Sequence, residues 1–372
     1  MLKIFARLSV FLWIITPQNT LAQIANTGMV EQMDSSTLGK VTFSGMLDVY
    51  YGYDFNEPVG SDRPYFVSSA RHNEINVNLA YLGINYRNEK VRARFVPGFG
   101  TYMNANYASE AGSLKNLVEA NAGVRLSKTL DIWVDAGVFG SPYTNESAIS
   151  KDHLMYSRSL APEFVPYYLT GVKLSAPLSK KLTGYFYVLN GWQNITDTNT
   201  PLSIGTQLEY RPGKRTLINF NTYVGDEVST ANPIYGMRYF SDIYLIFNPE
   251  GKFSMTSCIY GGIQQEFIGG IESHHLWWQV NWIGKYSLNK KASISARLEY
   301  FSDPNEIMIR SITSEKVDQL ASSGLCFNYK VNSNAMFRAE YRNFLSNKNI
   351  YTADNFETNF SNLLITSLCV WF

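Results

Sequence analysis

The chain ends in the sequence NFSNLLITSLCVWF, residues 359–372. Counted back from the terminus, Leu364, Thr366, Leu368, Val370 and Phe372 fall on one face of a β-strand, because successive side chains of a strand point to opposite faces. Chain ends are usually polar and solvated. An apolar strand at this position therefore predicts that the last residues pair with another strand and close a sheet.

The same alternation recurs from Val41 onward. Residues 292–300 show it most clearly, with Ala292, Ile294 and Leu298 on one face. A phase slip near Gly83 predicts a β-bulge there. We count about 16 such segments, many of them with the length of a tilted membrane-spanning strand. The predicted strands cover residues 41–51, 74–86, 91–102, 117–126, 130–139, 167–176, 181–189, 202–210, 216–224, 239–247, 253–263, 276–288, 292–300, 317–329, 335–344 and 359–372.

The connections between these segments alternate between short and long. Residues 88–90 and 289–290 are tight turns, whereas residues 56–73, 104–116 and 140–166 are long insertions. Outer-membrane β-barrels have short periplasmic turns and long external loops. The sequence therefore predicts an all-β fold, a transmembrane antiparallel up-and-down β-barrel of about 16 strands. A secreted protein built from several stacked sheets is the alternative.

The terminal aromatic residue adds a second indication. Phe372, at the end of an alternating strand, resembles the assembly signal of bacterial outer-membrane barrels. The resemblance implies that Phe372 acts in assembly, and that the partners of the chain are the barrel assembly machinery and outer-membrane lipid.

The first residues have the pattern of a secretory signal peptide. Lys3 and Arg7 flank the apolar run 8–15, and a small-residue cleavage site follows at residues 20–22. We predict a signal peptide over 1–22, a flexible N-terminal lead over 23–39 and a barrel over 40–372, located in the cell outer membrane. Without Lys3 and Arg7 the chain has one more acidic than basic residue, so its charge does not indicate a nucleic-acid partner.

The sequence contains no catalytic or metal-binding motif. Its three cysteines, Cys258, Cys326 and Cys369, lie far apart inside predicted strands, and this odd number argues against a disulfide framework. No nucleophile or metal-ligand spacing surrounds the four histidines, which are His72, His153, His274 and His275. We therefore predict that the protein is not an enzyme and holds no metal or other cofactor.

The polar faces of the predicted strands carry charges of both signs. A barrel of about 16 strands encloses an aqueous lumen that side chains cannot fill, so these charges are predicted to line a water-filled pore. In the alternative interpretation, opposite charges pair with one another and brace the wall. The predicted pore-lining residues are Arg92, Arg94, Glu119, Arg125, Asp131, Asp135, Arg297, Glu299, Arg338, Glu340 and Arg342.

Residues 140–166 form the longest insertion and the third one on the long-loop side. The topology resembles that of general diffusion porins, whose third external loop folds into the barrel. This resemblance implies that the segment narrows the lumen against Arg92, Arg94 and Arg125, whereas an external cap is the alternative. The predicted constriction residues are Glu146, Asp152, His153, Arg158 and Glu163.

Several short stretches resemble one family. Residues 137–142, 159–163, 166–168 and 190–192 read GVFGSP, SLAPE, PYY and NGW, and they are similar to the β-barrel porin family often called OmpL-like, common in Bacteroidetes. Trp192 is predicted to be an interfacial anchor. The resemblance implies an outer-membrane porin for passive diffusion of small hydrophilic solutes. A binding or adhesion barrel with a closed lumen is the alternative, and both a monomer and a homotrimer stay open.

Overall fold

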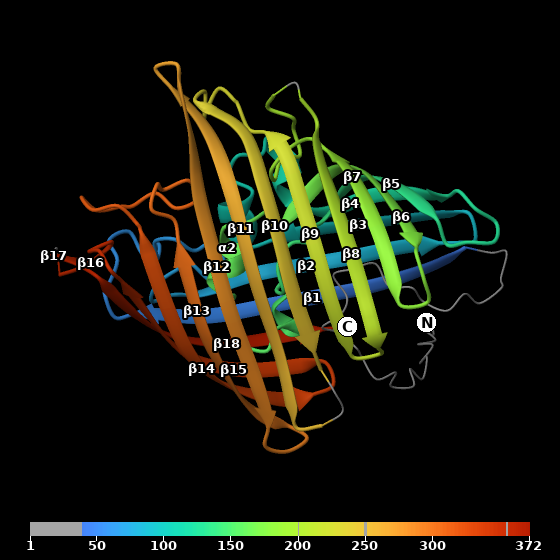
Figure 1. Cartoon of the computed structure of the whole chain (residues 1–372). Helices are drawn as coiled ribbons and strands as arrows, with labels where there is room; N and C mark the ends of the chain where they lie inside the picture. The colour runs from blue at the N-terminus through green and yellow to red at the C-terminus, as the bar shows by residue number, and fades with distance from the viewer. Residues whose placement is uncertain (1–38, 200, 249–250, 355) are drawn as a thin grey trace, which may run out of the picture.

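The described part of the chain forms a closed antiparallel barrel of 16 strands (Figure 1). The computed structural model describes residues 39–199, 201–248, 251–354 and 356–372. The predicted signal peptide and all of the predicted lead except Gly39 lie outside these residues. The barrel strands are β1 (Lys40–Asp54), β2 (Ile75–Arg87), β3 (Val91–Phe99), β4 (Leu117–Arg125), β5 (Trp133–Gly140), β6 (Tyr168–Pro177), β7 (Leu182–Leu189), β8 (Ser203–Gly213), β9 (Thr216–Asp226), β10 (Tyr235–Phe247), β11 (Phe253–Ile268), β12 (Ile271–Ser287), β13 (Ala292–Ser302), β14 (Gln319–Asn332), β15 (Ala335–Ser346) and β18 (Phe360–Trp371).

The remaining elements are short and belong to the long loops. They are α1 (Thr101–Asn106), η2 (Gly112–Asn116), η3 (Ser150–Asp152), α2 (Leu160–Glu163) and the hairpin of β16 (Tyr351–Ala353) with β17 (Phe356–Thr358). Among the described residues, no helix has the length and apolar character needed to cross a membrane.

The last strand closes the barrel as the sequence predicts. β18 pairs antiparallel with β1, from Met46 opposite Trp371 to Asp54 opposite Leu363. Beyond the strand, the backbone N–H groups of Phe372 and Gly45 each donate to the carbonyl oxygen of the other at 3.1 Å. Leu364, Leu368, Val370 and Phe372 are exposed on the outer face of the wall. This closure confirms the predicted fold class.

The β-bulge lies at Asn78 and not near Gly83, so that prediction was wrong. In the pairing of β1 with β2, Asp48 lies opposite Leu79 and Val49 opposite Val77, which leaves Asn78 as the extra residue. The Asn78 amide donates to Asp48 at 2.9 Å, and its oxygen accepts from the backbone N–H of Ser69 at 2.8 Å. These bonds satisfy the side-chain amide of Asn78. The bulge turns Leu79 inward to a buried position.

The hairpin of β11 and β12 is longer than predicted. Its strands contain 16 and 17 residues and meet at a tight turn at Gly269 and Gly270, where the predicted strands left residues 264–275 as a loop. His274 and His275 pair across the hairpin with Gln265 and Gln264. Polar residues at successive positions hid the alternation, although backbone pairing continues through them. Figure 1 shows this hairpin rising beyond the neighbouring strands.

Candidate functional site

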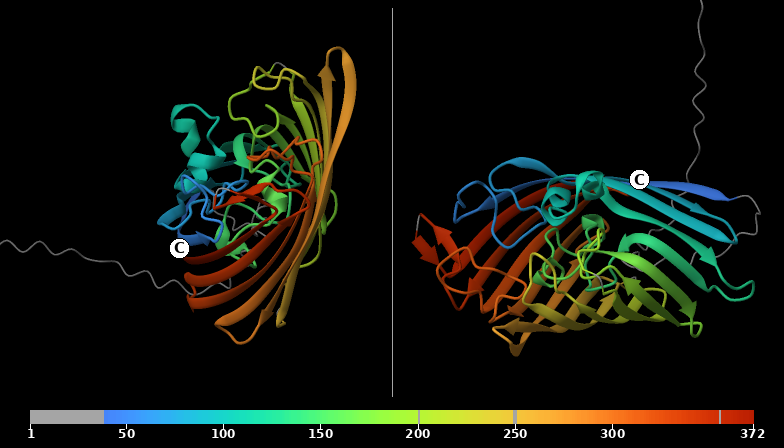
Figure 2. Two further views of the ribbon diagram at one scale, coloured as in Figure 1. Left: turned by 90° about the vertical axis from the view of Figure 1, so that its left-hand side faces the viewer. Right: turned by 90° about the horizontal axis from the view of Figure 1, so that it is seen from above.

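The longest insertion lies inside the barrel. Residues 140–166, here called the inward segment, connect β5 to β6 and are mostly buried. The Asn221 amide on β9 donates to the carbonyl oxygen of Pro142 at 2.9 Å. Other polar groups of the segment bond to inward-facing residues of β10, β12, β13 and β15, as described below. In Figure 2 the chain of this region lies within the ring of strands. The barrel interior therefore holds a folded layer of its own chain.

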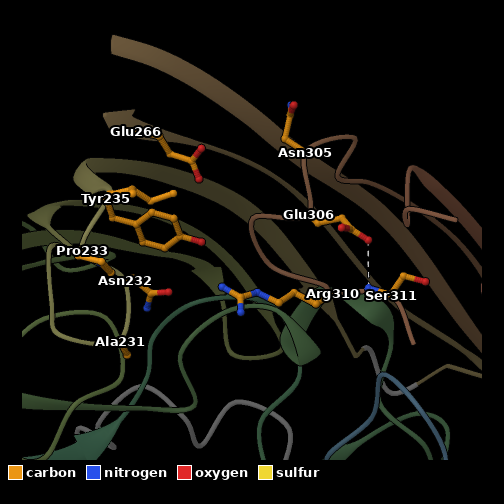
Figure 3. A pocket seen from close by; sticks show the side chains of 10 residues that line it. Ala231, Asn232, Pro233, Tyr235, Glu266, Asn305, Glu306, Arg310 and Ser311 are labelled. Atoms are coloured by element: carbon orange, nitrogen blue, oxygen red, sulfur yellow. Dashed lines mark hydrogen bonds between the residues drawn. The ribbon is translucent and has the colours of Figure 1, made fainter. Parts of the chain in front are cut away.

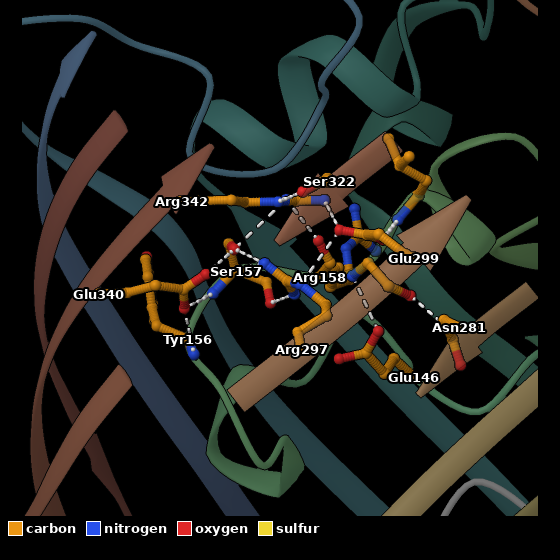
Figure 4. A network of polar contacts seen from close by, with 12 residues as sticks. Glu146, Tyr156, Ser157, Arg158, Asn281, Arg297, Glu299, Ser322, Glu340 and Arg342 are labelled. Carbon is orange, nitrogen blue, oxygen red and sulfur yellow. Dashed lines mark hydrogen bonds and ion pairs between the residues drawn. The ribbon is translucent and has the colours of Figure 1, made fainter. Parts of the chain in front are cut away.

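Glu340 on β15 is the first anchor of the inward segment (Figure 4). Its carboxylate accepts hydrogen bonds from the backbone N–H groups of Tyr156 at 2.8 Å and Ser157 at 2.9 Å, and also from the Ser157 hydroxyl. Arg297 on β13 donates to the same carboxylate at 2.8 Å. A buried carboxylate thus has both a cationic partner and several N–H and O–H donors, which compensate for the loss of water.

Glu299 on β13 is the second anchor. It accepts a hydrogen bond from the backbone N–H of Leu160 at 2.5 Å and pairs with Arg297 at 3.1 Å and with Arg342 at 2.5 Å. Arg342 also donates to the carbonyl oxygen of Arg158 at 2.8 Å. The wall charges therefore hold the main chain of the inward segment as well as one another.

Arg338 on β15 binds the inward segment at residues 150–153. Its guanidinium donates to the carbonyl oxygens of Ser150 at 2.7 Å and His153 at 3.0 Å. Uncharged and acidic groups of the opposite strands complete the attachment. Asp242 on β10 accepts from the backbone N–H of Thr144 at 2.7 Å, and Asn281 on β12 exchanges hydrogen bonds with Asn145 at 3.0 and 3.1 Å.

The anchoring role of Asp242, Asn281 and the backbone of residues 144–160 was missed at the sequence level. These positions belong to no motif, and a backbone N–H group has no signature in the sequence. The inward face of a strand was the one available signal, because Asp242 and Asn281 alternate with outward apolar residues.

Of the five predicted constriction residues, Glu146, His153 and Arg158 are buried, the Glu163 side chain is 1% exposed and the Asp152 side chain is 13% exposed. Their contacts hold the inward segment together. Glu146 accepts from the backbone N–H of Ser159 at 2.8 Å, and burial raises the pKa of the Glu146 carboxyl. Asp152 pairs with Lys151 at 2.9 Å, and burial raises the pKa of Asp152 to about 6. Burial lowers the pKa of His153 to about 3, and the neutral ring bonds through Nε2 to the carbonyl oxygen of Ser147 at 2.8 Å.

Arg158 and Glu163 form an ion pair at 3.3 Å inside the barrel. The Arg158 guanidinium lies over the ring of Tyr167, 3.9 Å from its centroid, and Glu163 accepts from the backbone N–H of Val67 at 3.0 Å. This pair therefore connects the inward segment to the loop between β1 and β2.

The three arginines against which the inward segment was predicted to narrow the lumen, Arg92, Arg94 and Arg125, pair with carboxylates of the wall. Arg92 pairs with Asp135 at 2.5 Å, Arg94 with Glu119 at 2.8 Å and Arg125 with Asp131 at 3.6 Å. The arginine side chains here are 13–37% exposed, whereas those of Arg297 and Arg342 are at most 1% exposed. Solvent reaches the β3–β5 wall, and the inward segment covers the charges of β13 and β15.

All 11 predicted pore-lining residues therefore fall into two groups. Arg92, Arg94, Glu119, Arg125, Asp131 and Asp135 form ion pairs along β3, β4 and β5, and the side chains of all except Asp135 are partly exposed. Arg297, Glu299, Arg338, Glu340 and Arg342 are buried beneath the inward segment. The alternation of the strands identified inward positions in both groups, but it carried no information about which of them a folded loop would cover.

Trp192 is not an interfacial anchor, so that prediction was wrong. Its ring stacks on Tyr143 of the inward segment, with centroids 5.9 Å apart, and meets Tyr223 and Phe240 edge-on at 4.9 and 5.1 Å. The loop after Asn190 thus turns into the barrel, where the indole packs in an aromatic cluster.

The cysteines and histidines form no reactive centre among the described residues. All three cysteines are free and buried. His274 and His275 lie on the long hairpin beside Glu272 and Glu266, at 3.4 and 3.2 Å. No group of three metal-ligating side chains gathers in the described part of the chain.

Comparisons with known proteins point to one class. A family model described as "Putative beta-barrel porin-2, OmpL-like" matches residues 40–372. No protein of curated function was found to match. Among solved structures, the outer membrane channel DcaP of Acinetobacter baumannii superposes with a TM-score of 0.63 at 10% identity, over 91% of this chain and 99% of that one.

Two further structures share the fold at similarly low identity. The anion-selective porin from Comamonas acidovorans has a TM-score of 0.59 at 10% identity and covers 90% of this chain and 100% of its own. The trimer form of OmpT from Vibrio cholerae has a TM-score of 0.56 at 11% identity, over 90% of this chain and 99% of that one.

Proposed function

Because the chain belongs to this family of OmpL-like β-barrel porins, we propose that small hydrophilic solutes cross its barrel along the wall from β3 to β5. Family membership and the fold support an outer-membrane channel for passive diffusion. The proposal adds the route: solutes pass between this wall and the inward segment.

The observation that carries the route is the difference in exposure between the two groups of wall charges. Charged side chains that stay hydrated belong beside water, whereas dry ion pairs belong to a packed interface. On the β3–β5 wall the arginines keep 13–37% of their side-chain surface, and on β13 and β15 the inward segment removes almost all of it. The inward segment then narrows the barrel from the β10–β15 side.

Conductance of single barrels in planar lipid bilayers tests this function. Purified protein inserted into the bilayer is expected to give discrete current steps in potassium chloride. A folded and inserted barrel without any ion current would instead favour the binding or adhesion barrel with a closed lumen. In that case the dry packing of the inward segment would act as a plug.

Two further points belong to the same proposal. We expect no catalytic role, since the described histidines and cysteines form no nucleophile or metal centre.

We also expect a homotrimer, because the structurally similar OmpT is named as a trimer form. The molar mass of the protein in detergent, measured by light scattering, distinguishes a trimer from a monomer.

A further inference from the structure

A hollow of about 490 Å³ opens at the long-loop end of the barrel. It lies between the loop before β10 and the loop after β13, with the end of β11 beside it (Figure 3). Its polar lining includes side chains from all three places, namely Asn232, Tyr235, Glu266, Asn305, Glu306 and Arg310. A concave site on which several polar side chains converge is a candidate small-molecule site.

Arg310 is the charge of this hollow that the protein leaves available. Its side chain is exposed and has no hydrogen-bond or ion-pair partner among the described residues. Figure 3 shows the guanidinium extending into the hollow toward the side on which Asn232 lies. A guanidinium presents five N–H donors in a planar arrangement that matches a carboxylate in a bidentate pair.

The two carboxylates of the hollow already have partners. Glu306 accepts from the backbone N–H groups of Ser311 and Val317, both at 3.0 Å. Glu266 lies 3.2 Å from the His275 ring, on the neighbouring strand of the long hairpin. Arg310 is thus the one charged side chain of the lining that has no partner among the described residues.

The amides of the lining offer a different chemistry. The side chains of Asn232 and Asn305 have no hydrogen-bond partner among the described residues. Each amide can donate to one hydroxyl group and accept from another, and Tyr235 adds an aromatic ring. Hydroxyl groups next to a carboxylate are the features of a sugar acid.

A separate part of the barrel wall carries an excess of positive charge. From β2 to β8, six inward cations face four carboxylates, Glu119, Asp131, Asp135 and Glu209. The six cations, here called the basic wall, are Arg87, Arg92, Arg94, Arg125, Lys173 and Arg211. An excess of fixed positive charge raises the local concentration of anions.

We infer that the hollow at Arg310 binds small hydroxylated carboxylic acids, such as sugar acids, before they enter the channel. Arg310 pairs with the carboxylate, and Asn232 and Asn305 bond to the hydroxyl groups. As an entry site this inference rests on the proposed function, whereas the binding itself does not require an open lumen.

Calorimetric titration of the intact protein in detergent with glucuronate tests the binding, with glucose as the neutral probe of similar size. Glucuronate is expected to bind more tightly than glucose, and Arg310→Gln is expected to weaken glucuronate binding at least about tenfold, as for loss of a charge-assisted hydrogen bond. Lys316→Gln is the matched control, since Lys316 is an exposed cation of the same loop outside the hollow.

The outcomes separate the two proposals. Equal binding of glucose and glucuronate, or glucuronate binding that Arg310→Gln leaves unchanged, would overturn the sugar-acid site. If the barrel conducts ions but binds no glucuronate, the site is wrong and the channel stands. If glucuronate binds in an Arg310-dependent way but no current flows, the site stands and the channel is wrong.

Discussion

The carboxylate of Glu340, on β15, accepts a 2.8 Å hydrogen bond from the backbone N–H of Tyr156, in the middle of the inward segment. Both residues are buried, and the bond joins positions 184 residues apart in the chain. A wall residue thus determines the course of a loop backbone inside the barrel. The width of the proposed route beside the β3–β5 wall consequently depends on this anchor.

Replacing Glu340 by Gln should loosen the inward segment. The amide keeps the shape of the side chain but removes the charge that Arg297 and two backbone N–H groups now share. Removing one partner of a buried ion pair costs about 3 to 5 kcal/mol, because the other charge stays buried without compensation. A loss of this size should have a measurable effect on the inward segment. We expect a larger or noisier single-channel conductance and faster tryptic cleavage after Lys151.

Glu272→Gln is the matched control for that experiment. Glu272 also faces a basic residue, His274 at 3.4 Å, but its side chain is 50% exposed on the long hairpin. It should leave conductance and cleavage at the values of the unmodified protein. Identical behaviour of Glu340→Gln and the unmodified protein would show that the remaining anchors at Glu299 and Asp242 suffice.

Reversing two charges of the basic wall should change ion selectivity. The double substitution Arg92→Glu and Arg94→Glu replaces two partly exposed cations beside Asp135 and Glu119 by carboxylates. The zero-current potential in a salt gradient is therefore expected to shift toward cation preference. Lys214→Glu, in the exposed turn between β8 and β9, changes charge by the same type of step outside the barrel and should have little effect.

The two new carboxylates could disturb the wall, so folding of the double variant is checked separately. Heat-modifiable migration of the folded barrel in gel electrophoresis reports whether the double variant still folds. A folded double variant with unchanged selectivity would place the ion route elsewhere than along β3.

The fold could be predicted from the sequence because alternate residues of a membrane-spanning strand face the lipid and the lumen, so apolar and polar residues alternate. The alternation around Leu364 and Leu368, and the short and long connections, sufficed for a closed barrel of 16 strands and for its closing pair. The stretches GVFGSP, SLAPE and NGW also indicated the family, which the match of its family model to residues 40–372 confirms.

The interior could be predicted only in part. Alternation placed Arg297 and Arg92 on the same inner surface, yet one is buried in a dry network and the other is partly exposed beside Asp135. The difference depends on the path of the inward segment, which its backbone N–H groups determine by bonding to Glu340 and Glu299. Every residue except proline carries the same backbone donor, so no pattern of side chains shows which donors bond to the wall.

Lowering the pH should destabilise the inward segment through His153. Burial lowers the pKa of His153 from its ordinary value to about 3, with Arg158 and Arg338 acting in the same direction. Its contribution to stability is therefore present above pH 6.5 and is lost as the pH falls from there toward 3, which amounts to about 3 kcal/mol at pH 4. Thermal unfolding at pH 7 and pH 4 should show this loss.

His153→Gln isolates that effect. Glutamine can still donate to the carbonyl oxygen of Ser147 but does not titrate. Asp152 acts in the opposite direction, because its raised pKa of about 6 gives stability at low pH that is lost as the pH rises through 6, and it is present in both proteins. The unmodified protein should therefore lose more stability between pH 7 and 4 than His153→Gln, and an equal loss would assign the acid response to other groups.

Removing Phe372 should reduce barrel assembly without altering selectivity. The residue forms the last pair of backbone hydrogen bonds in the closing seam, with Gly45 at 3.1 Å. Its ring lies over Gly45, where a Cβ atom would come within 2.4 Å of the ring carbon. The side chain is 69% exposed on the outer face, away from the basic wall.

Deletion of Phe372 should lower the amount of heat-modifiable barrel in the membrane. Phe372→Ala keeps the backbone pair, so it separates the contribution of the ring from that of the backbone hydrogen bonds. Phe360→Ala removes an exposed ring from the other end of β18 and serves as the control. The barrels that do insert should keep the ion preference of the unmodified protein. Normal assembly of the deletion variant would show that the closing strand needs no terminal aromatic residue.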